Sequence, residues 1–170
     1  KSESVELQEL HAVVALARTS RLLDPQQEKI ILGAANLTNR PVQEIMLSSD
    51  AISSLLADGD IADALIAAHL DMHTRFPVTE RKNDPQAIIG YVNFKDIVAH
   101  MRISPTGGES IRKIIRPIPS FSAETFVSDC LERLIREHVH IALVRNEAQL
   151  VVGMITLEDI IEELVGDIED

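Results

Sequence analysis

The sequence Gly-Tyr-Val-Asn-Phe-Lys-Asp-Ile-Val at residues 90–98 returns, with similar residues, as Gly-Met-Ile-Thr-Leu-Glu-Asp-Ile-Ile at residues 153–161. In both copies a glycine and an apolar run typical of a strand lead into the start of a helix. A pattern that returns after about 63–65 residues indicates an internal repeat, and a repeat of this length determines the architecture of the chain.

The segments upstream of each glycine repeat as well. The strand predicted at residues 74–78 corresponds to residues 139–143, and each follows a histidine, His73 or His138. The preceding helix matches at four apolar positions: Ile61, Leu65, Ile66 and Leu70 in the first copy, and Phe126, Cys130, Leu131 and Ile135 in the second. With turns at residues 82–85 and 145–148, each copy predicts a β-α-β-β-α unit of about 60 residues.

Two helices are predicted ahead of the repeats. Apolar residues at helical spacing indicate an amphipathic helix over residues 5–17. Asp24 followed by Pro25 is typical of an N-cap with proline at the first helical position, and Glu28 is expected to complete the capping.

The predicted fold is therefore a mixed α/β fold of the α+β class, with two β-α-β-β-α repeats after two helices. One repeat alone buries too little apolar surface, so we expect the two to pack as a pair. The predicted domains are a helical arm at residues 1–40, a first repeat at 41–103 and a second repeat at 104–170.

Composition excludes several classes of partner. The 170 residues carry a net charge of −11, and only 3% are aromatic. A negative chain repels a phosphate backbone, and few aromatic rings are available to stack on bases, so no nucleic-acid partner is predicted. The single cysteine, Cys130, excludes an internal disulfide, and no apolar run approaches the ~20 residues of a membrane span. We expect a soluble chain in the cytoplasm.

These patterns resemble the tandem CBS-domain (Bateman) family, and within it the modules of CorC/HlyC-like and CNNM-like proteins associated with magnesium and cobalt transport. Residues 73–78, His-Thr-Arg-Phe-Pro-Val, are similar to that family's His-Ser-Arg-Phe-Pro-Val strand, and residues 153–168 are similar to its C-terminal signature. The chain departs from the family at residues 46–49, which lack the usual Met-x-Pro-Arg, and at residues 146–148, which lack Asp-Glu-Gly.

The resemblance implies that the second helix start holds an adenine nucleotide, and the residue types suit that chemistry. A helix start offers backbone N–H groups and the positive end of the helix dipole to a phosphate. Thr156 adds a hydroxyl, Asp159 can accept hydrogen bonds from both ribose hydroxyls, and Gly153 lets the strand pass close to a ligand. The alternative is purely structural, because Thr-x-x-Asp is also a helix capping box.

The strand at residues 74–78 is implied to face this nucleotide, with Phe76 and Pro77 lining the adenine pocket and Thr74 and Arg75 offering polar contacts. Its alternative role is a plain central strand, although Pro77 suits an edge or a bulge better. The complete set of residues implied to bind the nucleotide is Thr74, Arg75, Phe76, Pro77, Ile118, Pro119, Ile141, Ala142, Gly153, Thr156, Glu158 and Asp159.

The first repeat is predicted to bind more weakly, because Asn93 stands where the second repeat has threonine, although Asp96 is retained. We therefore expect about one nucleotide per chain.

Other candidate sites have weaker support. His138 and His140 are two apart in a predicted strand but lack further ligands at metal-binding spacing, so no metal site is predicted. The acidic residues at the C-terminal end, Glu158, Glu162, Glu163, Asp167, Glu169 and Asp170, form either a solvated helix face or a Mg²⁺-sensitive surface.

No motif of an enzyme is present, and no catalytic residue is predicted. The function implied by the resemblance is a regulatory module that senses AMP or ATP, with or without Mg²⁺, for a membrane ion-transport protein. The expected partners are a second copy of the chain and the membrane domain of the same protein, with the module on the cytoplasmic side of the inner or plasma membrane. Two alternatives stay open: a structural dimerisation domain with a degenerate pocket, and a phosphate-ester hydrolase using Asp159 and His140.

Overall fold

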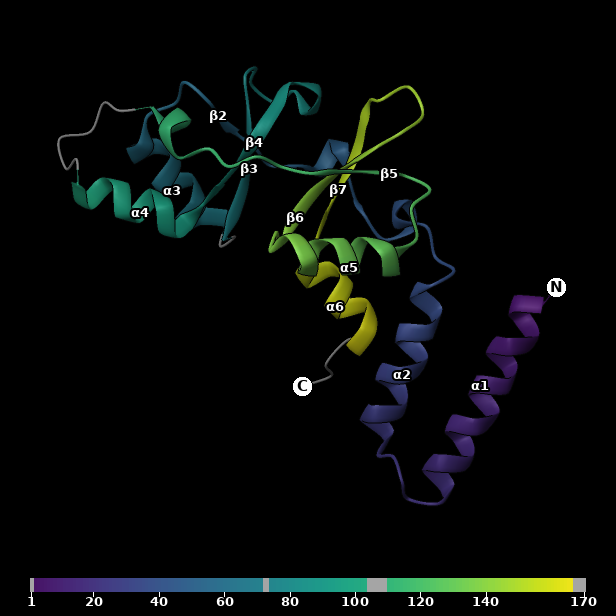
Figure 1. The fold of residues 1–170 in the computed structure, drawn as a ribbon. Coiled ribbons are helices and arrows are strands. Elements are labelled where there is room, and N and C mark those ends of the chain that lie inside the picture. Colours follow the sequence, from purple (N-terminus) through teal and green to yellow (C-terminus); the bar gives the residue numbers. More distant parts are fainter. Residues whose placement is uncertain (1, 72–73, 104–109, 167–170) are drawn as a thin grey trace. The chain divides into compact units, whose positions relative to one another are not determined.

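The computed structural model describes residues 2–71, 74–103 and 110–166 (Figure 1). These residues form six α-helices and two small sheets, which confirms the predicted α+β fold with two helices at its start. None of the helices in the described part of the chain combines the length and the apolar character needed to cross a membrane.

The described residues divide into two compact units. The helical unit contains residues 2–46, 122–140 and 155–166, and the sheet unit contains the remainder, residues 47–71, 74–103, 110–121 and 141–154. Short 3-10 helices connect the longer elements at Val42–Glu44, Ser49–Ala51, Pro85–Ala87 and Ile111–Ile114.

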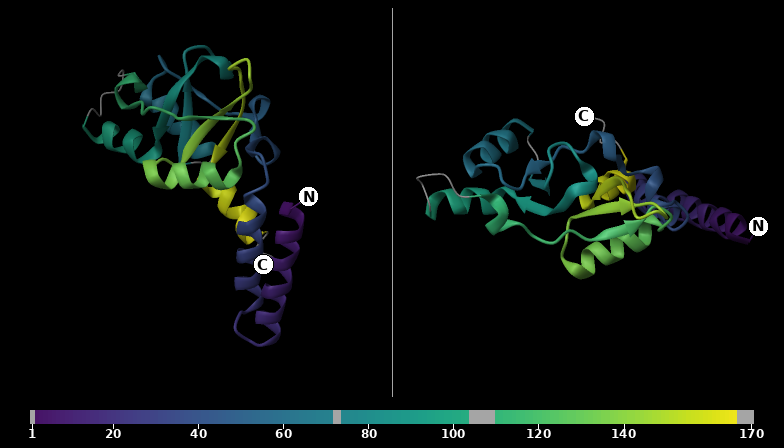
Figure 2. Two further views of the ribbon diagram at one scale, coloured as in Figure 1. Left: turned by 45° about the vertical axis from the view of Figure 1, so that its right-hand side comes forward. Right: turned by 90° about the horizontal axis from the view of Figure 1, so that it is seen from above.

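The helical unit begins with a hairpin of α1 (Ser2–Thr19) and α2 (Pro25–Leu37), which lie side by side in Figures 1 and 2. Asp24 caps α2 as predicted, since its Oδ1 accepts a hydrogen bond from Gln27 N at 2.8 Å. The expectation that Glu28 completes this cap was wrong. Gln27 Oε1 accepts from Asp24 N at 3.1 Å, because the third helical position is the one that reaches back, and Glu28 pairs with Arg18 at 3.2 Å.

The same unit contains α5 (Val127–Glu137) and α6 (Leu157–Val165), and α2 packs against both. α5 is strongly amphipathic and buries Val127, Cys130 and Leu134. It ends at His138, which adopts a left-handed conformation with φ of 54°.

The sheet unit contains a three-stranded sheet in the order β2 (Leu55–Leu56), β3 (Arg75–Thr79), β4 (Ile88–Asn93). β3 runs parallel to β2 and antiparallel to β4. The helices α3 (Ile61–Asp71) and α4 (Phe94–Ile103) pack together beside this sheet. They share one aliphatic core, whose buried members are Ala57, Ile61, Ala64, Ala68, Phe76, Val78, Val92, Ile97 and Ile111.

The second sheet has the order β1 (Leu47–Ser48), β7 (Val151–Thr156), β6 (Ile141–Arg145), β5 (Ser120–Ser122). The last two residues of β7 and the last residue of β5 belong to the helical unit. Within the sheet unit the two sheets meet through Ile88, Leu143 and Val151, which form a small apolar cluster. The Gln86 side chain adds two hydrogen bonds of 2.8 Å, one to the N–H and one to the C=O of Val151.

The repeat is present, but its predicted register was wrong upstream of each glycine. α3 and α5 begin 66 residues apart, as do β3 and β6, whereas β4 and β7 begin 63 apart. Ile61 therefore corresponds to Val127 rather than to Phe126, and Arg75 corresponds to Ile141. The cause is the turn between the two long strands of each repeat, because the turn from β3 to β4 is three residues longer than the turn from β6 to β7. His73 lies outside the described residues, and the domain boundaries stay a prediction.

Candidate functional site

The start of α6 carries the two residues on which the predicted site depends most. Thr156 ends β7 and is the N-cap of α6, and its Oγ1 accepts a hydrogen bond from Asp159 N at 3.2 Å. Asp159 Oδ2 accepts in return from Thr156 N at 3.0 Å. This reciprocal capping box confirms the structural role foreseen as the alternative for these residues, and it fixes the Asp159 carboxylate at the positive end of the helix.

One carboxylate oxygen of Asp159 stays available. In the described part of the chain, Asp159 Oδ1 accepts no hydrogen bond, and the residue is partly exposed. A carboxylate held this way keeps the lone pairs of Oδ1 for a donor from outside, such as the hydroxyl of a sugar.

The backbone donors at this helix start are less open than the sequence suggested. Leu157 N donates to His140 O at 2.9 Å, and Asp159 N donates to Thr156 Oγ1, so two donors expected to face a phosphate already have partners. The reason is general, because a helix start at the end of a strand must satisfy its own N–H groups. The helix dipole remains as an attraction for an anion.

Glu158 and His140 lie close together beside the capping box. Glu158 Oε1 is 3.9 Å from His140 Nδ1, and both side chains are partly exposed. The contact is an ion pair only when the imidazole is protonated.

Strand β3 offers polar groups at one end and apolar ones in its middle. Thr74 is exposed, and Arg75 Nη1 donates to Thr74 Oγ1 at 3.3 Å. Phe76 is only 2% exposed and belongs to the aliphatic core, so its ring serves the core as in a plain central strand. Residues alternate along a strand, so Pro77 shares the opposite face with Arg75.

Pro77 lies in the central strand of its sheet, but at a position that behaves as an edge and directly precedes a register shift at Val78 and Thr79, in keeping with the expectation. It stands opposite Tyr91, whose N–H and C=O both bond Arg116 on the far side of β4. The backbone of Pro77 therefore faces β2, which pairs with β3 only from Val78 onward. A residue without an N–H costs no ladder bond at this position.

The remaining predicted residues lie in the second sheet. Pro119 O accepts from Leu143 N at 2.9 Å, which places Ile118 and Pro119 next to β6 with its buried Ile141 and Ala142. Ile118 packs against the cluster that joins the two sheets. Gly153 is buried in the neighbouring strand β7 and pairs with Ser48.

The structure thus brings together two groups of predicted residues. Thr156, Glu158 and Asp159 meet in the helical unit. The other nine predicted residues belong to the sheet unit: Thr74 directly precedes β3, and the rest lie on β3, on β6 and β7, and on the segment before β5. A single pocket formed by both groups stays a prediction.

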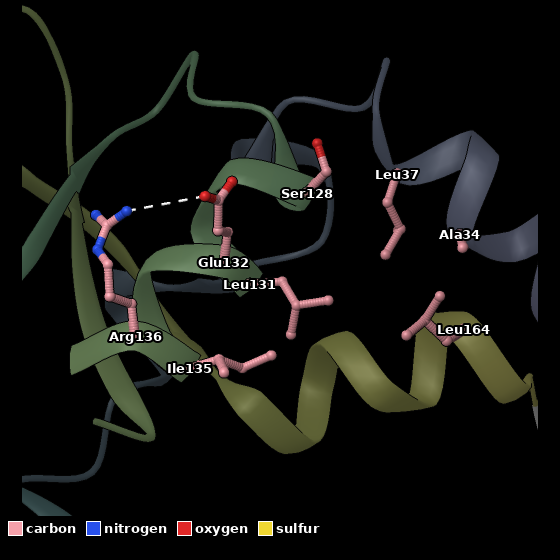
Figure 3. A pocket seen from close by; sticks show the side chains of 8 residues that line it. All are labelled: Ala34, Leu37, Ser128, Leu131, Glu132, Ile135, Arg136 and Leu164. Carbon is pink, nitrogen blue, oxygen red and sulfur yellow. Dashed lines mark ion pairs between the residues drawn. The ribbon is translucent and has the colours of Figure 1, made fainter. Parts of the chain in front are cut away.

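The helical unit contains a hollow that the sequence analysis did not predict (Figure 3). It has a volume of about 530 Å³ and lies among α2, α5 and α6. Figure 3 shows apolar side chains pointing into it from all three helices, and the ion pair of Glu132 and Arg136, 3.8 Å apart, at one side. Its lining consists of Ala34, Leu37, Ser128, Leu131, Glu132, Ile135, Arg136 and Leu164. Only the amphipathic pattern of α5 hinted at it.

Neither a metal centre nor a reactive thiol is found among the described residues. They contain no group of three or more His, Cys, Asp or Glu side chains suited to a metal ion. His138 is the exposed C-cap of α5. Burial raises the pKa of the Cys130 thiol to about 12, so this cysteine stays protonated and is a poor nucleophile. Of the acidic C-terminal residues, Asp167, Glu169 and Asp170 lie outside the described residues.

Comparison with known proteins gives consistent matches. A family model for the CBS domain matches residues 110–166. The chain is 29% identical over 163 residues to the magnesium and cobalt efflux protein CorC of Pasteurella multocida, a match that covers 96% of the chain and 53% of that protein. The curated relatives it matches are longer, and the chain spans between 30% and 57% of their length.

Solved structures agree with these matches. The CBS domain of the bacterial CNNM/CorC family Mg²⁺ transporter in complex with ATP is similar with a TM-score of 0.76 and 29% identity, covering 85% of this chain and 100% of that one. A hemolysin-like protein containing a CBS domain, from Oenococcus oeni, has a TM-score of 0.73 and 33% identity, covering 81% of this chain and 98% of that one.

Proposed function

This chain belongs to the CBS-domain modules of the CorC/CNNM magnesium and cobalt transport family, and from that premise we propose that it binds one adenine nucleotide at the start of α6 and regulates an attached membrane transport domain. The module is regulatory rather than catalytic. Its place is on the cytoplasmic side of the inner or plasma membrane, next to the transport domain of the same protein.

The observation that carries the proposal is the state of Asp159. Its Oδ2 is fixed by the capping box, and its Oδ1 is open. A ribose presents two neighbouring hydroxyls, and a carboxylate whose orientation is already set can accept both without losing the freedom of a mobile side chain. The dipole of α6 favours the phosphate at the same end.

The solved complex with ATP supports this reading, because a protein 29% identical to this chain binds an adenine nucleotide on the same fold. On β3 itself, Arg75 and Pro77 remain the candidates for contact with an adenine, whereas Phe76 points into the core. Ile118, Pro119, Ile141 and Ala142 supply apolar surface nearby in the sheet unit. Flat, mostly apolar surroundings with few polar groups are typical of small-ligand sites.

The helical arm is proposed to carry the signal, because α6 connects the nucleotide to α2. A Cβ on Gly33 of α2 would lie 2.8 Å from Leu164 O of α6, so the two backbones are in direct contact. Arg40, just after α2, pairs with Glu163 at 2.7 Å. A ligand that binds one arrangement of α6 more tightly than another shifts α2 with it.

Calorimetric titration with AMP, ATP and Mg·ATP tests the site. Thr156→Ile removes the hydroxyl and fills the adjacent space, and we expect it to weaken binding by about 1–3 kcal/mol from the lost hydrogen bond alone. Asn93→Ile is the matched control at the first repeat and is expected to change binding little. If Asn93→Ile lost binding and Thr156→Ile kept it, the nucleotide site would lie in the first repeat, contrary to the proposal.

The hollow among α2, α5 and α6 supports a second proposal, a homodimer in which the occupant is a second copy of the chain. The adjacent Glu132 and Arg136 have opposite charges, which suits a self-complementary two-fold interface, because Glu132 of one copy can meet Arg136 of the other. Ile135, which lines this hollow, is 58% exposed, which favours an apolar partner.

Light scattering at tens of micromolar tests the dimer, with Ile135→Arg as the disrupting variant and Leu150→Arg, at an exposed turn of the sheet unit, as the control. We expect a dimer for the parent and the control and a monomer for Ile135→Arg. A dimer is also expected if the chain is a purely structural dimerisation domain. That alternative would hold if the dimer formed and no nucleotide bound.

A further inference from the structure

The first repeat contains a carboxylate in the position of Asp159, and the structure gives it a different partner. Asp96 follows Asn93 by three residues at the start of α4, as Asp159 follows Thr156 at the start of α6. Both oxygens of Asp96 accept hydrogen bonds from one guanidinium: Arg116 Nε lies 2.7 Å from Oδ2, and Arg116 Nη2 lies 3.2 Å from Oδ1.

Asn93 does not hold Asp96 in the way that Thr156 holds Asp159. Asn93 Oδ1 accepts from Lys95 N at 3.1 Å, two residues along, rather than from the third helical residue. Among the described residues, the reciprocal box that holds Asp159 has no counterpart in α4, and the carboxylate of Asp96 bonds Arg116 instead.

Arg116 is held in place by its own backbone as well as by its side chain. Its N–H donates to Tyr91 O at 2.8 Å, and its C=O accepts from Tyr91 N at 3.0 Å. The segment lies so close to β4 that a Cβ on Gly90 would overlap Arg116 O and stand 2.5 Å from Ile115 Cγ2. Both ends of the Asp96–Arg116 pair are therefore anchored within the sheet unit.

We infer that Arg116 is a built-in occupant of the ribose position in the first repeat, and that it restricts the chain to one nucleotide. The inference rests on the proposed function, because it assigns to Asp96 the ribose contact proposed for Asp159. The guanidinium occupies both carboxylate oxygens of Asp96, whereas Asp159 keeps Oδ1 open for the ribose hydroxyls. In the folded chain, the Asp96–Arg116 pair thus excludes a ribose from Asp96.

The charge of the guanidinium keeps Arg116 paired with Asp96. An arginine stays protonated at every physiological pH, and the hydrogen bond that it donates to Asp96 raises the pKa of Arg116 further. The side chains are 53% and 28% exposed, so the pair adds little to stability and its removal leaves a folded chain. Arg116 is accordingly a specificity-determining residue for occupancy rather than a structural one.

Calorimetric titration of the full chain with Mg·ATP tests the inference in four proteins: the parent, Asn93→Thr, Arg116→Gln, and the double variant. We expect one site in the parent and in Asn93→Thr, and a second, weaker site once Arg116 is replaced, strongest in the double variant. Arg81→Gln combined with Asn93→Thr is the control, because Arg81 holds Asp84 in a similar exposed pair at 2.8 Å. This control should keep one site.

Two results overturn the inference: a second site in Asn93→Thr with Arg116 intact, or one site in the double variant. Failure of the proposed function is seen separately, as no binding by the parent. In that event, binding gained only by the double variant still supports the role of Arg116, and absence of binding in all four proteins rejects it. When Thr156→Ile is added to the double variant, we expect binding at the α6 site to weaken and binding at the new site to remain.

Discussion

The two helix starts of this chain share a sequence pattern and differ in what their carboxylates do. In the second repeat, Thr156 and Asp159 satisfy each other and leave Asp159 Oδ1 open. In the first, Asn93 bonds Lys95, and Asp96 is held on both oxygens by Arg116. The comparison teaches that an aspartate at a helix start indicates a ligand site only when the remaining lone pairs have no partner within the protein.

The largest effect should come from removing each carboxylate in turn. Asp159→Ala is expected to weaken nucleotide binding by about two to four orders of magnitude, because two hydrogen bonds to a charged acceptor are lost, each about 1.5–3 kcal/mol. Asp96→Ala should leave the affinity of that site unchanged. Titration calorimetry of both variants measures this, and equal losses would erase the proposed difference between the repeats.

Asp159→Ala should also lower the free energy of unfolding by about 1 kcal/mol, because the capping box is lost. Asp96→Ala should change it less, since its partner Arg116 is an exposed side chain. Urea denaturation separates this loss of stability from the loss of binding.

The next effect concerns the path from α6 to the arm. Gly33→Val would push a branched side chain against Leu164 O, and overpacking of this kind costs about 1–3 kcal/mol. We expect nucleotide binding to persist while ligand-dependent hydrogen-exchange protection of α1 and α2 disappears. Asn36→Val, at an exposed position of the same helix, is the matched control. Protection that survives in Gly33→Val would mean that the arm responds by another route.

Much of this arrangement was predictable from the sequence, and the failures have physical causes. Local patterns predicted the two leading helices, the repeat and the capping box, because they depend on neighbouring residues. The contact of Gly33 with Leu164 and the pair of Asp96 with Arg116 join distant segments, and no local pattern reports them. The register error arose from a turn that is longer in the first repeat. Phe76 had two possible faces, and only the structure showed which one enters the core.

Magnesium should sharpen the comparison of ligands at the open site. The chain carries a net charge of −11, so a triphosphate is repelled unless a cation neutralises it. We expect millimolar Mg²⁺ to tighten ATP binding by roughly tenfold and AMP binding much less. Titration in excess EDTA provides the reference. Equal ATP affinity in EDTA and in Mg²⁺ would contradict this electrostatic reasoning.

The smallest effect lies in the arginine pairs of the sheet unit. Hydrogen bonds from Arg112 lower the pKa values of Asp58 and Glu80 below their usual 3.8 and 4.5. Carboxylates with depressed pKa values stabilise the fold above those usual values, and this contribution is lost as the pH falls through the folded-state pKa. Arg112→Gln should return both pKa values toward normal, as read by NMR titration. Unchanged values would mean that these exposed pairs do not persist in solution.

The most direct test of the central claim is a crystal structure of the chain grown with saturating Mg·ATP. The account predicts one nucleotide per chain, with its ribose hydroxyls on Asp159 and with Arg116 still bound to Asp96. A nucleotide whose ribose lies on Asp96, with Arg116 displaced, would contradict the account.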